Sequence, residues 1–187
     1  MRGRFLIAVA VVLGLAGAAL ARAQDAAPAA RIAALLQALR AAPDESVAGV
    51  IEQRLRLLWA EAGSPAAVLL QARGMRDLVN HADRDAMRAF DAALVIDPAY
   101  AAGYADRAVA RWRSGDVGGA IGDIEAALQH DPRLFVVFDT LSRIAESRGD
   151  WAAALLAWRR YAAADPRGLG VQARLRRLES KARGEKS

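Results

Sequence analysis

The chain has 187 residues, with 26 basic and 21 acidic side chains, no cysteine and a formal net charge of +5. This length allows one domain or a short array of repeats, and the 25% charged and 55% hydrophobic fractions exclude wholesale disorder. The lack of cysteine excludes a disulfide scaffold, a thiolate zinc site, a cysteine nucleophile and lipid attachment through an N-terminal cysteine. The abundance of alanine and leucine predicts an all-helical protein.

The first 23 residues have the layout of a secretory signal. Two arginines precede the uncharged run 5–20, and small residues at positions 21 and 23 suit a cleavage site. We predict cleavage between Ala23 and Gln24, a periplasmic mature protein, and a flexible leader at 24–30. The alternative is an uncleaved anchor in the inner membrane, although the apolar run is shorter than the roughly 20 residues of a spanning helix.

Two amphipathic helices are predicted next, at 31–42 and 45–61. Ser64-Pro65 ends this pair, because proline biases the residue before it out of the helical conformation. We expect residues 31–66 to form a divergent helical pair that caps the units that follow.

A 34-residue period organises the middle of the chain. The residues that recur at this spacing are Asp97-Pro98, Asp131-Pro132 and Asp165-Pro166; Ala86, Ala120 and Ala154; and Phe90, Ile124 and Trp158. They define three tandem units at 67–100, 101–134 and 135–166. Each unit is predicted to hold two helices and a turn, such as 101–114 and 117–129 in the second unit. An aspartate after the turn caps the second helix, and the proline follows its end.

The repeat resembles the tetratricopeptide repeat (TPR) family. The resemblance covers Ala67 to Pro166, with small residues at Gly74, Ala108 and Ser142 in the first helices, and the block around residues 51–74 is similar to small secreted alphaproteobacterial members. It implies an all-α, right-handed solenoid of helix-turn-helix units, in which neighbouring units stack to bury their apolar faces. It also implies a concave groove, lined by the first helices, that binds a peptide or protein segment.

Carrying the groove over by position gives ten expected binding residues: Val68, Gln71, Met75, Val79, Ala105, Val109, Arg113, Val136, Asp139 and Arg143. This face is mostly apolar and suits an extended segment with hydrophobic anchors and an acidic group for the two arginines. The alternative is that Arg113 and Arg143 are merely solvated. The positions of the family's carboxylate clamp hold Gln71, Met75, Asp106, Val136 and Thr140, which argues against that type of binding.

No residue pattern indicates catalysis, a metal or a cofactor. His81 lies near Asp83 and Asp85, but one turn of three polar residues favours a capped helix start over a metal site. Gly118-Gly119 lacks the Gly-Lys-Ser/Thr motif and the preceding strand of a phosphate loop. The sequence pattern indicates no Ser-His-Asp triad either, so we predict that the protein is not an enzyme.

Residues 167–187 are predicted to form a capping helix and a basic tail. Val171, Leu175 and Leu178 are expected to seal the last unit, while Arg174, Arg176, Arg177 and Lys181 are expected to face solvent. From Arg174 to Lys186 the tail has six basic and two acidic residues, which permits peripheral contact with anionic lipid.

The high pI of about 10.4 therefore reflects the signal and the tail, and a nucleic-acid partner is not expected for an exported protein. The sequence predicts a non-catalytic periplasmic module that binds a protein or peptide, of undetermined oligomeric state. The alternative is a structural adaptor of an envelope complex that associates with the membrane surface through its basic C-terminal helix.

Overall fold

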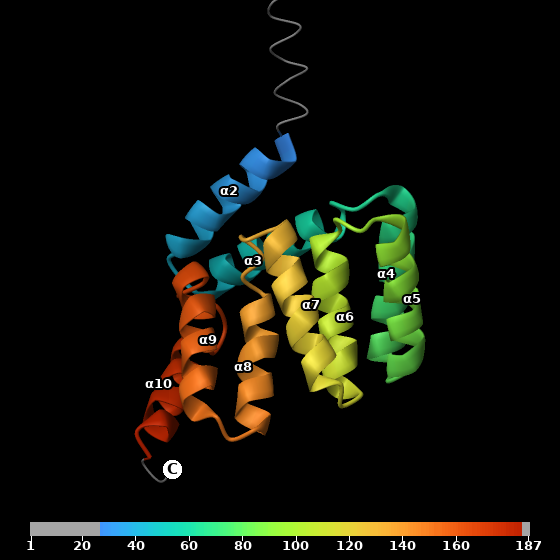
Figure 1. Cartoon of the computed structure of the whole chain (residues 1–187). Coiled ribbons are helices and arrows are strands. Elements are labelled where there is room, and N and C mark those ends of the chain that lie inside the picture. The colour runs from blue at the N-terminus through green and yellow to red at the C-terminus, as the bar shows by residue number, and fades with distance from the viewer. Residues whose placement is uncertain (1–26, 185–187) are drawn as a thin grey trace, which may run out of the picture.

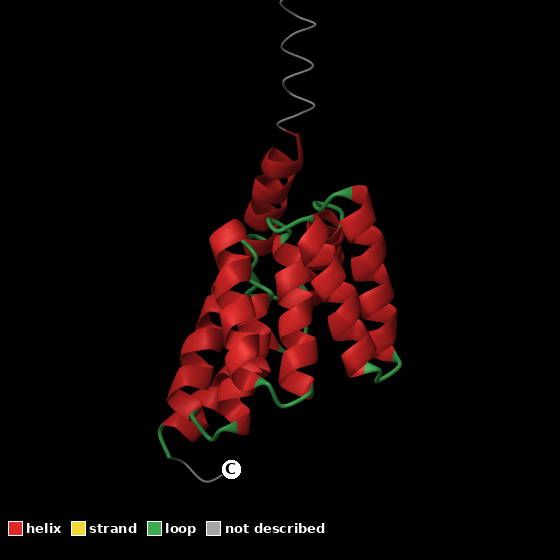
Figure 2. Ribbon diagram, turned by 45° about the vertical axis from the view of Figure 1, so that its right-hand side comes forward, coloured by secondary structure: helices red, strands yellow, loops and turns green. Residues whose placement is uncertain are grey.

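The structure is a computed structural model and describes residues 27–184; the predicted signal and its cleavage site lie outside this range. Between these bounds every regular element is a helix (Figures 1 and 2), which confirms the all-α prediction. The helices are α2 (Ala27–Arg40), α3 (Glu45–Ala60), α4 (Pro65–Val79), α5 (Asp83–Ile96), α6 (Ala101–Arg113), α7 (Val117–His130), α8 (Val137–Ser147), α9 (Trp151–Ala164) and α10 (Val171–Ala182). None of the described helices has the length and apolar character needed to cross a membrane.

Three antiparallel helix pairs, α4–α5, α6–α7 and α8–α9, stand side by side, and α10 packs against α9 (Figure 1). The turns inside the last two pairs use Gly115 and Gly149, whose φ angles of 91° and 73° are costly for residues with a Cβ atom. Asp116 and Asp150 then cap the following helices by accepting the backbone N–H three residues on. The repeated Gly-Asp pair thus specifies where α7 and α9 begin.

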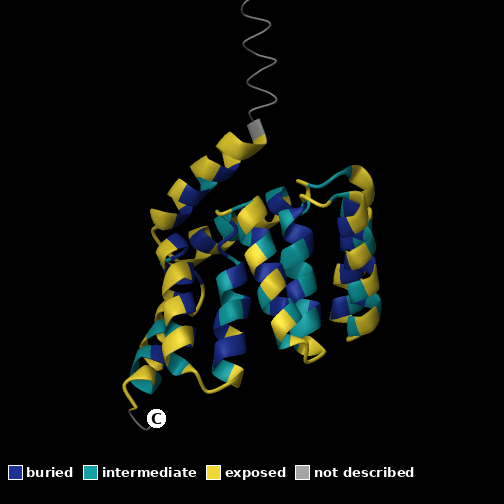
Figure 3. Cartoon of the chain, in the orientation of Figure 1, coloured by how far each residue is buried: buried dark blue, intermediate teal, exposed yellow. Residues whose placement is uncertain are grey.

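The recurring small and large residues form the core of each pair. Ala86, Ala120 and Ala154 are fully buried, and so, nearly, are the bulkier residues four positions later. Figure 3 shows the buried residues in dark blue along the helices. Gly74 is required by this packing, because a Cβ atom there would lie 2.5 Å from the ring of Phe90.

The start of α2 differs from the prediction. Residues 27–30, expected in a flexible leader, belong to the first turn of this helix. Pro28 explains the difference, because proline suits the first helical turn, and the alanines around it have the highest helix propensity.

The N-terminal pair also differs from the expected stacked cap. α3 packs against α6, and α2 packs against α9, so α3 runs across the array instead of continuing it (Figure 1). It follows the turns that contain the Asp-Pro dipeptides. From α3, Trp59 Nε1 donates to Asp131 Oδ2 at 3.1 Å, and Glu52 Oε1 accepts from Tyr161 Oη at 2.9 Å. Just beyond α3, the Ser64 N–H donates to Asp97 Oδ2 at 2.7 Å.

Trp59 gives the physical reason for this crossing. Its side chain is 3% exposed, and its ring packs edge-on against Phe135 at a centroid distance of 5.9 Å. The indole N–H also needs an acceptor when buried, and the Asp131 carboxylate supplies one. Asp131 of the second Asp-Pro turn therefore holds α3 in place, and Asp97 of the first holds the residue Ser64 just beyond it.

At the C-terminus, Val171 and Leu178 are buried against the last unit as predicted. Arg174 is a correction, because its side chain is only 15% exposed instead of facing solvent. Its guanidinium bonds to Glu146 at 2.6 Å, pairs with Asp139, and lies 4.1 Å from the ring centroid of Trp158. The opposite charges of the two carboxylates and the aromatic face of Trp158 thus compensate the guanidinium group for its loss of hydration.

Candidate functional site: a cavity beneath the crossing helix

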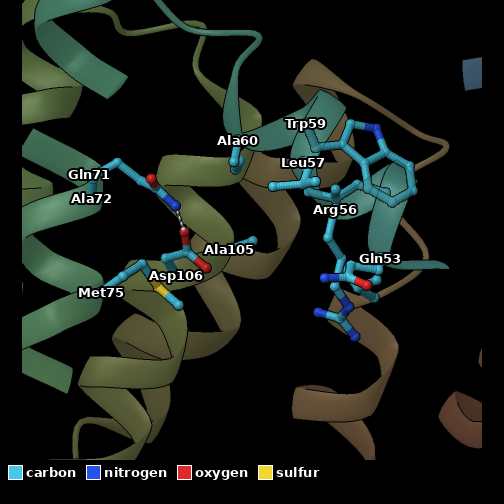
Figure 4. A pocket seen from close by; sticks show the side chains of 13 residues that line it. Gln53, Arg56, Leu57, Trp59, Ala60, Gln71, Ala72, Met75, Ala105 and Asp106 are labelled. Atoms are coloured by element: carbon cyan, nitrogen blue, oxygen red, sulfur yellow. Dashed lines mark hydrogen bonds between the residues drawn. The ribbon is translucent and has the colours of Figure 1, made fainter. Parts of the chain in front are cut away.

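The crossing of α3 creates a cavity of about 420 Å³ between this helix and the first helices α4 and α6. α3 contributes Arg56 and Leu57, α4 contributes Gln71 and Met75, and α6 contributes Asp106 (Figure 4). The volume lies in the range of cavities that bind small molecules or single side chains. In an open solenoid groove these first-helix residues face solvent, whereas here α3 forms an opposing wall.

Asp106 is the acidic group of the cavity. Its Oδ2 accepts a hydrogen bond of 2.6 Å from Nε2 of Gln71, while Oδ1 accepts no hydrogen bond from residues 27–184. Burial raises the pKa of Asp106 to about 6, against the opposing effects of the Gln71 hydrogen bond and the positive charge of Arg56. The site therefore holds a partly exposed carboxylate whose second oxygen can accept a hydrogen bond from a ligand.

Arg56 lies across the cavity but is already engaged. Its Nε and Nη2 both donate to Glu52 Oε1, at 3.0 and 2.6 Å, and Tyr161 donates to the same oxygen. Burial and the charge of Glu52 raise the pKa of the nearby Asp165. Because Glu52 balances the charge of Arg56, Asp106 leaves the cavity with an excess of negative charge.

Apolar side chains continue outward from the cavity. Met75 and Val79, which we call the α4 strip, are 39% and 75% exposed, and Leu57 of α3, which lines the same cavity as Met75, is 49% exposed. Met75 lines both the main cavity and a second hollow beside Val79 and Arg76. Exposed apolar side chains that adjoin a cavity are typical of interaction sites, and they give the cavity an apolar approach.

The structure brings together only part of the predicted groove. Gln71, Met75, Ala105 and Val136 line the cavity. Val79 lies farther along the α4 strip, and Val68 is partly buried outside the cavity. Val109 instead packs against a satellite core formed by Leu78, Ala86, Phe90 and Ala110.

The two predicted anion-binding arginines are bonded within the chain. Arg113 donates to the carbonyl oxygen of Leu78 at 2.9 Å and pairs with Asp83 at 3.0 Å, so it joins the first unit to the second. Arg143 pairs with Asp139 at 2.9 Å and remains 54% exposed. It lines a separate polar hollow of about 270 Å³ together with Trp112, Glu146, Arg174 and Arg177.

The sequence missed the contribution of α3, because residues 31–66 were expected to form a capping pair and none of them was assigned to the groove. It singled out Asp106 only as a residue that does not fit a carboxylate clamp. Two sequence features together could have indicated the cavity. One is the carboxylate of Asp106 in the middle of an apolar first-helix face, and the other is a helix before the first unit that carries one large aromatic residue, Trp59.

The His81 turn has a structural role. His81 has a φ of 59°, in the left-handed region that its counterparts Gly115 and Gly149 also occupy. Its Nδ1 lies 2.8 Å from a guanidinium nitrogen of Arg113. Between residues 27 and 184 no group of three or more His, Asp or Glu side chains is placed to hold a metal ion.

Comparisons with known proteins agree with this architecture. No protein-family model matches the chain. A TPR repeat-containing protein from Rhizobium etli is 26% identical over 160 residues, which cover 86% of this chain and 78% of the relative. The first TPR domain of Spaghetti (RPAP3), solved with an HSP90 peptide, superposes with a TM-score of 0.58 and 16% identity, over 63% of this chain and 93% of that domain. The TPR domain of Sgt2 from Aspergillus fumigatus gives 0.57 and 24%, over 65% and 80%.

The chain therefore has the all-α fold of a tetratricopeptide repeat solenoid, as its 34-residue period predicted, and its sequence is similar to that of a TPR repeat-containing protein. The crossing α3 and the cavity beneath it are the features of this chain that define its candidate site.

Proposed function

We propose that the protein is a non-catalytic periplasmic interaction module that binds an extended segment of a partner protein in the cavity beneath α3 and along the α4 strip. One observation carries this proposal: a cavity of about 420 Å³ opens beside the exposed apolar side chains of Leu57 and Met75. Apolar anchors in a preformed cavity, together with a few fixed polar groups, are the usual means of holding a peptide.

Two further observations support this function. A structural neighbour that shares the fold is a TPR domain solved with a bound peptide. The polar groups of the cavity, Gln71, Asp106 and Arg56, are held by hydrogen bonds before any ligand arrives, and such preorganisation reduces the entropic cost of binding.

The alternative is a structural adaptor that contacts a membrane surface through its basic C-terminal helix. Less of the structure supports it, because two of the positive charges of α10 are bonded within the chain. Arg174 and Arg177 both bond to Glu146, and the ammonium group of Lys181 lies 5.7 Å from the ring centroid of Trp151.

Site-specific photocrosslinking in cells tests the binding function. A photoreactive phenylalanine analogue at Met75 is expected to crosslink to one short segment of a partner, mapped by mass spectrometry. The same analogue at Val95, which is 81% exposed on α5, is the matched control. The added change Ala105→Phe fills the cavity and is expected to abolish the Met75 adduct. Equal crosslinking at Val95, or an adduct that survives Ala105→Phe, would contradict this site.

The location is tested separately by N-terminal sequencing of the exported protein. The periplasmic proposal expects the mature chain to begin at Gln24 after cleavage of a signal. A chain that retains Met1 and sediments with the inner membrane would establish the anchored form instead.

A further inference from the structure

We propose that the cavity selects a partner segment whose anchor is a long aliphatic side chain ending in a cation, as in lysine, with the cation bonded to Asp106. This inference rests on the proposed binding function and specifies its ligand chemistry. It reverses the charge expected from Arg113 and Arg143, both of which are engaged within the chain.

The geometry of Asp106 carries the first step. One carboxylate oxygen is held at 2.6 Å by Gln71, which fixes the orientation of the group, while Oδ1 has no hydrogen-bond partner within residues 27–184. Asp106 is partly exposed, and an ionised carboxylate has room for further hydrogen bonds, so this oxygen can accept one from a ligand. A ligand ammonium or guanidinium group would supply that donor and the opposite charge together.

The shape of the cavity carries the second step. Leu57, Met75, Ala105 and Val136 line the same cavity as Asp106 and give it apolar surface. A simple ammonium ion would leave this surface in contact with water, whereas the methylene groups of a lysine side chain would cover it. Amphipathic side chains with an apolar stem and a charged end are therefore the matching class of anchor.

The balance of charge carries the third step. Arg56 is the basic residue that lines the cavity, and its Nε and Nη2 donate to Glu52 Oε1 at 3.0 and 2.6 Å. An anionic ligand would find the charge of Arg56 already paired with Glu52 and would also approach the negative charge of Asp106. A cationic ligand meets Asp106 directly, so electrostatic complementarity favours it.

A direct binding experiment tests the inference with the purified protein at pH 7.5. The probes are N-acetylated, C-amidated pentapeptides Ala-Leu-Xaa-Leu-Ala, in which Xaa is lysine, norleucine or glutamate, and affinity is measured by isothermal titration calorimetry. We expect the lysine peptide to bind about tenfold or more tightly than the norleucine peptide, which keeps the apolar stem but lacks the cation. The glutamate peptide is expected to bind more weakly than both.

Two variants locate the effect. Asp106→Asn keeps the shape of the side chain and is expected to remove the preference for lysine over norleucine. Glu125→Gln on the exposed face of α7 makes the same change of charge away from the cavity and is expected to keep that preference. Circular dichroism checks that both variants are folded.

The outcomes separate this inference from the proposed function. If the lysine and norleucine peptides bind equally well and Ala105→Phe abolishes the binding of both, the cationic anchor is overturned but an apolar peptide groove remains. Preference for lysine that persists in Asp106→Asn would overturn the role of Asp106. Absence of binding by all three peptides at millimolar concentration would overturn both proposals for this cavity.

Discussion

Replacing Asp106 with asparagine is expected to stabilise the folded protein at neutral and higher pH. The groups that face this carboxylate are Arg56 from α3, Gln71 from α4 and Tyr100 at the start of α6. Tyr100 stays neutral, because burial raises its pKa. Despite the favourable effects of Arg56 and Gln71, burial dominates and raises the pKa of Asp106 from 3.8 to about 6.

The sign and size of the effect follow from this shift. The folded protein holds the Asp106 proton more tightly than the unfolded chain, so stability rises as pH falls from about 6 to about 4. Above pH 6 the full cost of the buried charge applies. Each pKa unit corresponds to about 1.4 kcal/mol, so the shift sets an upper limit of about 3 kcal/mol. Partial solvent access through the cavity reduces the expected cost to about 1–3 kcal/mol.

Urea denaturation of the wild type and Asp106→Asn at pH 8, 6 and 4 measures this contribution. The variant is expected to have the larger free energy of unfolding at pH 8, with the difference approaching zero at pH 4, because protonated aspartate and asparagine are both neutral. Glu125→Gln is the control and should show no comparable dependence. A difference between Asp106→Asn and the wild type that is zero at pH 8, or equal at pH 8 and pH 4, would refute the reasoning about burial.

Two further predictions concern the repeat itself, and both are measured as free energies of unfolding by urea denaturation at pH 7.5. Gly74→Ala is expected to destabilise the protein by about 1–2 kcal/mol, because the added methyl group would lie 2.5 Å from the Phe90 ring. Gly122→Ala, which has nothing within 4 Å of the added methyl group, should stabilise it by about 0.5–1 kcal/mol. The same sign for both variants would contradict the packing at Gly74. Ala82→Asp is expected to stabilise by about 0.5–1 kcal/mol, because residue 82 has nearly the φ and ψ angles of the capping residue Asp116 but no side-chain cap; a loss of stability would show that the added acidic charge outweighs the cap.

The repeat units were predictable because they depend on local chemistry. Gly115 and Asp116 specify a turn and a helix cap within a few residues of each other, and the Asp-Pro pairs end the second helices. The burial of Ala86 and Phe90 follows from a 34-residue period that makes each unit pack like the next. Such signals need no knowledge of distant parts of the chain.

The cavity was not predictable in this way, because it depends on contacts between residues far apart in the sequence. Trp59 meets Asp131 across 72 positions, and Glu52 meets Tyr161 across 109. The amphipathic pattern of a helix such as α3 indicates that one face is buried, but it does not indicate which surface that face packs against.

The sequence by itself therefore determined the solenoid, its period and its turns, and two of the residues it singled out, Gln71 and Met75, line the cavity. Only the tertiary structure decided that α3 crosses the array, that Arg113 is bonded within the chain, and that Asp106 lies in a cavity. The physical reason is that the helices and turns are set by neighbouring residues, whereas the charge and shape of the site arise where separate elements meet.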